Sequence, residues 1–238
     1  MRLLFIAALA LTLAACGQPK VEPEFGAKVR AYLLENPEVL IEVSQALEAK
    51  QQAERAEKAK ASIGPNRGKL ERDDRDHVLN PGGTVTVVQF FDYNCGYCKV
   101  IAPQILEMAR SRPDVRFVFK DMVIFGASSE YAAAAAFSAR SPAQFSSIHN
   151  ALMTAKPLNE AAVDRILTAH GIAPATVRAT MAGEKWQAYL RDVQSLASDM
   201  GIDGTPAFVV GDTLVRGADP DSLKAAIAAE QRRKNKTT

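Results

Sequence analysis

Cysteine and histidine are scarce in this 238-residue chain, which contains only three of each. Three cysteines are too few for the disulfide framework of a small secreted domain. Neither sign of charge dominates, since 29 lysines and arginines face 27 aspartates and glutamates, and this balance argues against a phosphate-reading surface or an acidic tail. We therefore do not expect nucleic acid as a partner. Hydrophobic residues make up 47% of the chain, which is enough to bury the core of a soluble globular protein.

The first fifteen residues lack the length of a membrane span but have the layout of a secretory signal peptide. Arg2 precedes an apolar run from Leu3 to Leu13, and two small residues follow. A membrane-spanning helix needs about 20 apolar residues, and this run is shorter. We therefore expect residues 1–15 to be removed after export to the periplasm.

The first cysteine, Cys16, follows this segment in the sequence LAACG. The sequence resembles the lipobox of bacterial lipoproteins, which implies that Cys16 becomes the first mature residue and carries a lipid. Residues 16–24 would then tether the protein to a membrane of the cell envelope. Gly17 implies the outer rather than the inner membrane, in a Gram-negative host. An ordinary signal peptide followed by an incidental cysteine is the alternative.

The segment from Phe25 to about Ile63 has a helical pattern, with apolar residues every three or four positions. Asn36 followed by Pro37 is typical of a helix start, so we predict two helices with a boundary there. Beyond Leu47 the apolar positions are mostly alanine. This N-terminal helical arm (25–63) is either a solvated linker or a segment that pairs with copies of itself, and the pattern leaves both open.

A compact domain is predicted at 68–232, because the sequence GPNRG at 64–68 is expected to break the helix. A strand, a helix and a second strand at its start form a βαβ unit with parallel strands. Alanine-rich, helix-forming sequence then indicates an all-helical insertion. The predicted elements are a strand at 84–91, a helix at 98–110, a strand at 115–119, the insertion at about 127–200, a hairpin at 207–215 and a helix at 220–230.

The remaining two cysteines form the motif Cys95-Gly96-Tyr97-Cys98, where the first strand meets the helix. A C-x-x-C motif beside a βαβ pattern indicates a redox site. A thiolate in the first turn of a helix is stabilised by free backbone N–H groups and by the helix dipole, so Cys95 is the predicted nucleophile. Cys98, one turn later, is expected to be more buried and to resolve a mixed disulfide.

Four features together resemble one known family: the segment FFDYNCGYCK, the later sequence GTPAF at 204–208, the helical insertion between them, and LLENPEVL near the N-terminus. They are similar to the thioredoxin-fold DsbA superfamily over about residues 25–232, and within it to the ScsC-like branch of bacterial suppressor-of-copper-sensitivity proteins. The resemblance implies a thioredoxin-like α/β fold with an all-helical insertion, preceded by an N-terminal helical arm. It also implies that Pro206 is cis and faces the cysteines, that the backbone beside it binds the substrate chain, and that Thr205 tunes the sulfur.

The resemblance also bears on which thiol reaction dominates. Tyr97 stands where strongly oxidising relatives have histidine, so Gly96 and Tyr97 provide no imidazolium to stabilise the Cys95 thiolate, and a weaker oxidant is expected. A CGYC motif with Thr205 before the proline is also found in disulfide isomerases, and the arm of the family can form oligomers. We therefore expect a disulfide isomerase or reductase that acts on protein disulfides and thiols and exchanges electrons with a redox partner protein. A DsbA-like oxidase is the alternative.

Gln89 is the one departure from the family pattern. Relatives commonly have a glutamate there, on the strand beneath the cysteines, as a proton acceptor. Glutamine cannot accept that proton, and Asp92, Lys120 and water are the candidates that could replace it. The sequence does not choose among them.

No cofactor or resident metal is expected. A zinc site would need two further ligands, and the histidines show no ligand spacing; they are His77, His149 and His170. An alternative of another class is a Cu(I)-binding copper-tolerance protein that holds the ion between Cys95 and Cys98, because soft thiolates select Cu(I). Against it, the six methionines form no clustered M-x-x-M run.

Overall fold

The computed structural model describes residues 22–236, so Cys16, the predicted signal peptide and most of the predicted tether lie outside the described residues. The chain divides into two compact units, one ending at Gln51 and the other beginning at Gln52. None of the helices within the described stretch could serve as a membrane span.

The described part of the first unit consists of helix α1 (Pro23–Glu35) and the beginning of helix α2 (Glu38–Glu71). The predicted boundary between two helices is confirmed. Asn36 closes α1 rather than opening α2, because its side-chain Nδ2 and its backbone N–H both donate to the carbonyl oxygen of Tyr32, each at 2.9 Å. The unit exposes large apolar side chains on both helices: Phe25, Val29, Tyr32, Leu34, Leu40, Ile41, Val43 and Leu47.

Helix α2 does not end at the predicted break. It continues through Gly64, Pro65 and Gly68 to Glu71, so the prediction of a helix end at 64–68 is wrong. Proline in a helix interior removes a hydrogen bond, and glycine is a poor helix former. The side chains of Ile63 and Leu70 are buried in the core of the second unit. This packing outweighs the unfavourable propensity and holds the last turns of the helix together.

The second unit is built on a five-stranded sheet of order β1-β3-β2-β4-β5. The strands are β1 (His77–Leu79), β2 (Val85–Phe91), β3 (Val115–Asp121), β4 (Ala207–Val210) and β5 (Thr213–Arg216). The central strands β2 and β3 are parallel and fully buried, which confirms the predicted βαβ unit. The predicted hairpin is β4 and β5, and Gly211 in its turn has a positive φ of 58° that favours glycine. Strand β1, antiparallel to β3, was not predicted.

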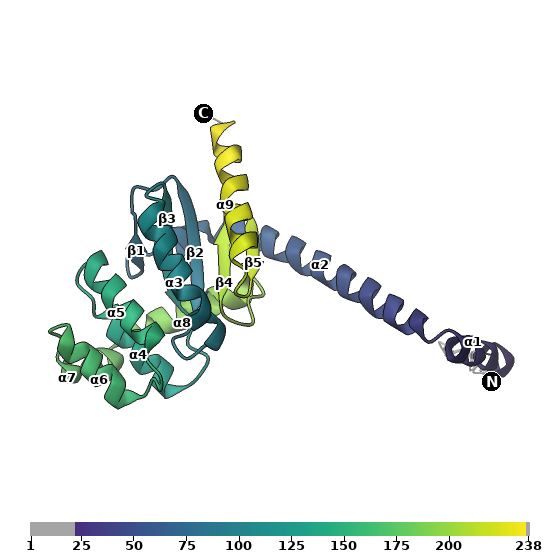
Figure 1. Cartoon of the computed structure of the whole chain (residues 1–238), viewed down its shortest axis with the longest axis horizontal. Helices are drawn as coiled ribbons and strands as arrows, with labels where there is room; N and C mark the ends of the chain where they lie inside the picture. Colours follow the sequence, from purple (N-terminus) through teal and green to yellow (C-terminus); the bar gives the residue numbers. More distant parts are fainter. Residues whose placement is uncertain (1–21, 237–238) are drawn as a thin grey trace, which may run out of the picture. The chain divides into compact units, whose positions relative to one another are not determined.

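Helices cover this sheet and build the insertion. Helix α3 (Gly96–Ser111) connects β2 to β3, and α9 (Pro220–Asn235) closes the chain along β2, β4 and β5. Figure 1 shows the predicted insertion as a group of helices beside the β1 edge of the sheet. It consists of α4 (Ala127–Phe137), α5 (Pro142–Thr154), α6 (Glu160–Ala169), α7 (Pro174–Met181) and α8 (Glu184–Asp199).

Candidate active site

Cys95 is the N-cap residue of α3, four residues after the end of β2. Its backbone is extended, with φ −69° and ψ 117°, and its sulfur accepts a hydrogen bond from the backbone N–H of Cys98 at 3.4 Å. Serine or aspartate usually caps a helix in this way. Here a sulfur takes that place, so the electrostatic field of the first helical turn acts directly on the reactive atom.

The surroundings of Cys95 stabilise its thiolate. The pKa of Cys95 is lowered to about 6, first by the hydrogen bond from the Cys98 thiol, and then, against the opposing effect of burial, by Thr205 and by the backbone N–H groups of Cys98 and Tyr97. At pH 7 a thiol with this pKa is about tenfold more often a thiolate than a thiol. Cys95 is therefore ionised at neutral pH and nucleophilic.

Cys98 has the opposite character. Its side chain is fully buried, whereas Cys95 retains 3% exposure. The pKa of Cys98 is raised, first because its thiol donates to Cys95 and then by burial. Both residues are free cysteines. The pair therefore combines an ionised outer sulfur with a protonated inner one, as attack followed by resolution requires.

Thr205 lies directly against this pair, and Pro206 follows it in the chain. The Thr205–Pro206 peptide bond is cis, as the family resemblance implies. In its protonated form the Cys95 thiol donates to the carbonyl oxygen of Thr205 at 3.1 Å. The carbonyl oxygen of Pro206 accepts from the backbone N–H of Gly217 at 2.8 Å. The structure thus brings Cys95 and Thr205 together although 110 positions separate them in the chain.

The comparisons with known proteins agree with this geometry. Residues 86–228 match the model of the DSBA-like thioredoxin domain, and residues 22–54 match the Copper resistance protein ScsC N-terminal domain. The chain belongs to the DSBA-like thioredoxin domain family. It therefore has the thioredoxin-like fold with a helical insertion, and the N-terminal match assigns it to the ScsC branch of these thiol-disulfide oxidoreductases.

Three solved structures illustrate the likeness. A thioredoxin-like oxidoreductase from Silicibacter pomeroyi is 36% identical, with a TM-score of 0.66 over 70% of this chain and 98% of that chain. ScsC of Proteus mirabilis is 28% identical, with a TM-score of 0.67 over 88% of this chain and 96% of the other. A periplasmic thioredoxin-like protein from Salmonella enterica is 30% identical, with a TM-score of 0.63 over 69% and 94%.

Asp92 supports the site of this DSBA-like domain through four hydrogen bonds. Its Oδ1 accepts from the backbone N–H of Asn94 at 2.7 Å and from the Ser129 hydroxyl at 2.6 Å. Its Oδ2 accepts from the backbone N–H groups of Ile124 and Phe125 at 2.8 and 3.1 Å. Asp92 therefore joins the redox loop to the loop between β3 and α4.

Lys120, the second candidate proton acceptor, and Gln89, which stands in place of the family glutamate, differ in their contacts. The Lys120 ammonium is buried, donates to the carbonyl oxygen of Lys69 at 2.7 Å and forms an ion pair with Asp76 at 2.6 Å. It fastens the end of α2 to β3 and has no free lone pair. Gln89 is buried with neither amide atom bonded to any described residue. The choice among Asp92, Lys120 and water as proton acceptor stays a prediction to be tested.

Four exposed apolar side chains lie on the two segments that Asp92 joins, the start of α3 and the loop between β3 and α4. Tyr97 and Val100, on the first turns of α3, are 71% and 67% exposed. Ile124 and Phe125, on the loop that Asp92 holds, are also exposed. Exposed apolar side chains around a reactive group are typical of a surface that meets another molecule. We call these four residues the apolar rim.

Lys99 connects α3 to the helical insertion. No pattern in the sequence indicates this contact. Its ammonium group donates to the carbonyl oxygens of Leu152 at 3.3 Å and Ala155 at 3.0 Å, at the C-terminal end of α5. Burial, followed by the positive charge of Lys156, lowers the pKa of Lys99. The end of α5 therefore adjoins the helix that carries the thiols.

Proposed function

We propose that this thiol-disulfide oxidoreductase acts mainly as a protein disulfide isomerase or reductase in the periplasm, and that a DsbA-like oxidase is the weaker candidate. The observation that supports the preference is the pKa of Cys95, about 6. Strong oxidants of this fold have a thiol pKa of about 3.5, and the reductant thioredoxin has one of about 7. A less stabilised thiolate means a less stabilised reduced form, and so a weaker oxidant.

The reaction begins when the Cys95 thiolate attacks a disulfide of the client protein. One sulfur of the client becomes bonded to Cys95, and the other leaves as a thiolate. If another client thiolate then attacks the client sulfur of this mixed disulfide, a new client disulfide forms, Cys95 is released and no electrons are transferred. This outcome is isomerisation.

Reduction follows when Cys98 resolves the same mixed disulfide. Cys98 loses its proton and attacks the Cys95 sulfur, so the client leaves as a second thiolate and the Cys95–Cys98 disulfide forms. The client has gained two electrons, which a redox partner protein must return to the cysteines. The burial and raised pKa of Cys98 keep this step slow relative to exchange among client thiols.

The client is expected to bind across the apolar rim and the Thr205–Pro206 loop. The exposed side chains of Tyr97, Val100 and Phe125 offer apolar contact to an unfolded chain. The Thr205–Pro206 segment directly precedes β4, and we expect its backbone to pair with a client segment as an added strand would. Such contacts depend little on sequence, as an enzyme with many clients requires.

We further propose that the chain forms oligomers through its N-terminal arm. The exposed apolar residues of α1 and of the first half of α2 lie within the segment that matches the ScsC N-terminal domain. Burying them against copies of the same segment removes apolar surface from water. Several active sites in one assembly could then act on one misfolded client.

The location of the protein is proposed from the sequence and from its relatives. One relative is a periplasmic protein, which agrees with removal of residues 1–15 on export. The lipid on Cys16 and an outer-membrane destination are further proposals. Metabolic labelling with a fatty acid tests them: the wild-type chain is expected to incorporate label, and a Cys16→Ser variant to incorporate none.

The reduction potential tests the preference between isomerase and oxidase. The Cys95–Cys98 pair is equilibrated with glutathione buffers, and the oxidised fraction is measured by thiol titration. A potential near that of protein disulfide isomerase, about −180 mV, or below it, supports the proposal. A potential near that of DsbA, about −120 mV, would assign the chain to the oxidases.

A further inference from the structure

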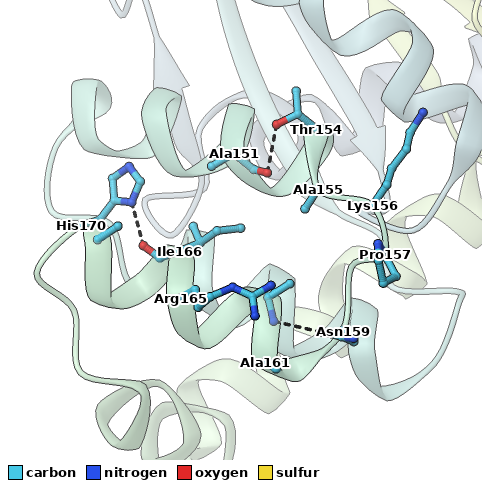
Figure 2. Close-up of a pocket in the computed structure, with 12 residues that line it drawn as sticks. Ala151, Thr154, Ala155, Lys156, Pro157, Asn159, Ala161, Arg165, Ile166 and His170 are labelled. Carbon is cyan, nitrogen blue, oxygen red and sulfur yellow. Dashed lines mark hydrogen bonds between the residues drawn. The ribbon is translucent and has the colours of Figure 1, made fainter.

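A groove opens on the helical insertion between the end of α5 and helix α6. The cavity has a volume of about 530 Å³. Alanine is the most frequent residue in its walls, for example Ala151 on α5 and Ala162 on α6. Figure 2 shows Arg165 between the helices, His170 at one end, and Lys156, Pro157 and Asn159 at the other. We call this feature the α5–α6 groove.

The positive charge of this groove has no partner within it. Arg165 is exposed and forms no ion pair or hydrogen bond with any of residues 22–236. The two acidic residues of α6, Glu160 and Asp164, form ion pairs with Arg178 on α7 at 3.8 and 3.0 Å. No acidic side chain lines the cavity in the described structure. The guanidinium of Arg165 is therefore available to an anionic ligand.

His170 closes the groove but does not compete with Arg165 for such a ligand. Its Nδ1 donates to the carbonyl oxygen of Ile166 at 2.8 Å, and its Nε2 then accepts from the hydroxyl of Ser147 at 2.9 Å. Both ring nitrogens are engaged, so the imidazole forms a wall.

Two lysines extend the positive charge from the groove to the thiols. Lys156 follows directly after Ala155, whose carbonyl oxygen accepts from Lys99, the neighbour of Cys98 on α3. In Figure 2 the side chain of Lys156 points away from Arg165, and its charge acts on Lys99. Lys99, Lys156 and Arg165 therefore form a cationic path from the redox helix into the α5–α6 groove.

We propose that this path binds an acidic segment of the polypeptide whose disulfide reacts with Cys95. This proposal rests on the function proposed above and adds a preference for one class of client. The argument is charge complementarity: Lys156 and Arg165 are exposed cations that lack acidic partners, on a groove open to solvent. Because the path begins beside Cys98, one client chain can meet the apolar rim with its cysteine and the groove with its acidic residues.

The size of the expected effect follows from the exposure of the cations. An exposed ion pair changes an equilibrium by about 1.4- to fivefold. Replacing both Lys156 and Arg165 by glutamate removes two attractions and adds two repulsions, so we expect kcat/KM for an acidic client to fall roughly tenfold. The effect should decrease at high salt, which screens exposed charges.

The test uses three disulfide-linked peptides with the same apolar core and with glutamate, glutamine or lysine flanks. Reduction of each peptide is measured at low salt and in about 0.5 M NaCl, where the electrostatic screening length is roughly one third of its low-salt value. The protein used is the chain from residue 17 onward, which keeps every described residue. We expect the wild type to prefer the glutamate peptide over the lysine peptide at low salt. The Lys156→Glu, Arg165→Glu double variant should reverse that preference and reduce the glutamine peptide at the wild-type rate.

Two control variants carry the same charge change elsewhere. Lys185→Glu on α8 and Arg232→Glu on α9 replace exposed cations outside the path. Neither variant should change which of the three peptides is reduced fastest and which slowest. A second measurement uses a glutamate peptide without cysteine, which should inhibit the wild type and not the double variant. Equal rates for the glutamate and lysine peptides in the wild type would overturn the proposal, as would equal slowing of all three in the double variant. If the wild type reduces no peptide, the proposed function fails instead.

Discussion

The Cys95 sulfur lies 3.1 Å from the carbonyl oxygen of Thr205, although 110 positions separate the two residues in the chain. This contact joins the first turn of α3 to the loop before β4. The nucleophile therefore lies where two segments meet, and both of them lower its pKa. The chemistry of Cys95 should respond to changes on both sides.

Removing the hydroxyl of Thr205 should make Cys95 less acidic. The Thr205 side chain contributes to the lowered pKa of Cys95. Its buried Oγ1 has no other hydrogen-bond partner among the described residues, so Thr205→Val is expected to raise that pKa. Thr205→Ser, which keeps the hydroxyl, is the matched control and should leave it nearly unchanged. The measurement is the thiolate absorbance near 240 nm (about the usual thiolate band) as a function of pH. An equal pKa in the two variants would show that the hydroxyl has no part in stabilising the thiolate.

The reactivity of Cys95 should follow its own titration. Because its pKa is lowered to about 6, alkylation by iodoacetamide should be slow at pH 5, rise through pH 6 and level off above pH 7. The Cys98 thiol is the first cause of the lowered pKa. Cys98→Ala is therefore expected to move the midpoint to higher pH, and Cys98→Ser, which retains a donor, to move it less. A wild-type midpoint above pH 8 would contradict the electrostatics described for the site.

The carboxylate of Asp92 should matter for stability more than for proton transfer. Asp92→Ala leaves four donors without their acceptor, and about 2 to 4 kcal/mol of unfolding free energy should be lost. Ser129→Ala removes one of these bonds and should cost about 1 kcal/mol. Urea unfolding measures both losses. A stable Asp92→Ala variant with slow resolution by Cys98 would instead identify Asp92 as the proton acceptor.

The buried pair of Lys120 and Asp76 should show a characteristic pH dependence. Burial is the first cause that raises the pKa of Asp76 to about 7, above its unfolded value. The folded protein therefore holds the Asp76 proton more tightly than the unfolded chain does. The stability that this gives the wild type is complete below the unfolded pKa of Asp76, and it is lost as the pH rises to about 7. Without Lys120 the pKa of Asp76 rises further, so Lys120→Met should keep losing stability above pH 7 where the wild type does not.

Urea unfolding at about pH 6, 7.5 and 9 checks this expectation, because the first value lies below the wild-type pKa of Asp76 and the other two lie above it. The difference in unfolding free energy between the wild type and the less stable Lys120→Met variant should increase from pH 7.5 to pH 9 (about two units above the wild-type pKa of Asp76). The double variant Lys120→Met, Asp76→Asn lacks the titrating group and should show a constant difference. A constant deficit in the single variant would mean that Asp76 does not titrate in this range.

The exposed apolar residues of α2 should hold the oligomer together. Leu40→Glu combined with Val43→Glu is expected to convert an oligomer into monomers, because charged side chains cannot be buried against an apolar surface without a large free-energy cost. Gln45→Glu, an exposed polar position on the same helix, is the control and should leave the mass unchanged. Light scattering gives the mass. A monomeric wild type would contradict the proposed role of the arm.

Local patterns predicted much of this structure. The strand at 84–91, the C-x-x-C helix and the hairpin around Gly211 each carry their signal within a few residues, and all three are confirmed. The helix end predicted at 64–68 was wrong because Ile63 and Leu70 pack into a core that the local sequence does not show. Tertiary packing overrides local propensity in this way.

The contacts between distant segments were beyond the sequence pattern. The cis bond at Pro206 could be expected only from the family resemblance. The role of Lys99 depends on carbonyl oxygens more than 50 positions away and has no local signal. The sequence contains a partial signal for the role of Asp92, because an aspartate two residues before Asn94 is typical of a turn in which the side chain accepts a backbone hydrogen bond. Its bonds to Ile124 and Phe125 still required the structure.

The reactivation of a scrambled-disulfide protein tests the proposed isomerase function most directly. The chain from residue 17 onward is compared with its Cys95→Ser and Cys98→Ser variants. Because exchange needs only the outer sulfur, the wild type should restore activity, Cys98→Ser should retain part of it, and Cys95→Ser should have none. If the wild type restores nothing while still oxidising a reduced peptide, the protein is an oxidase and the isomerase proposal is wrong.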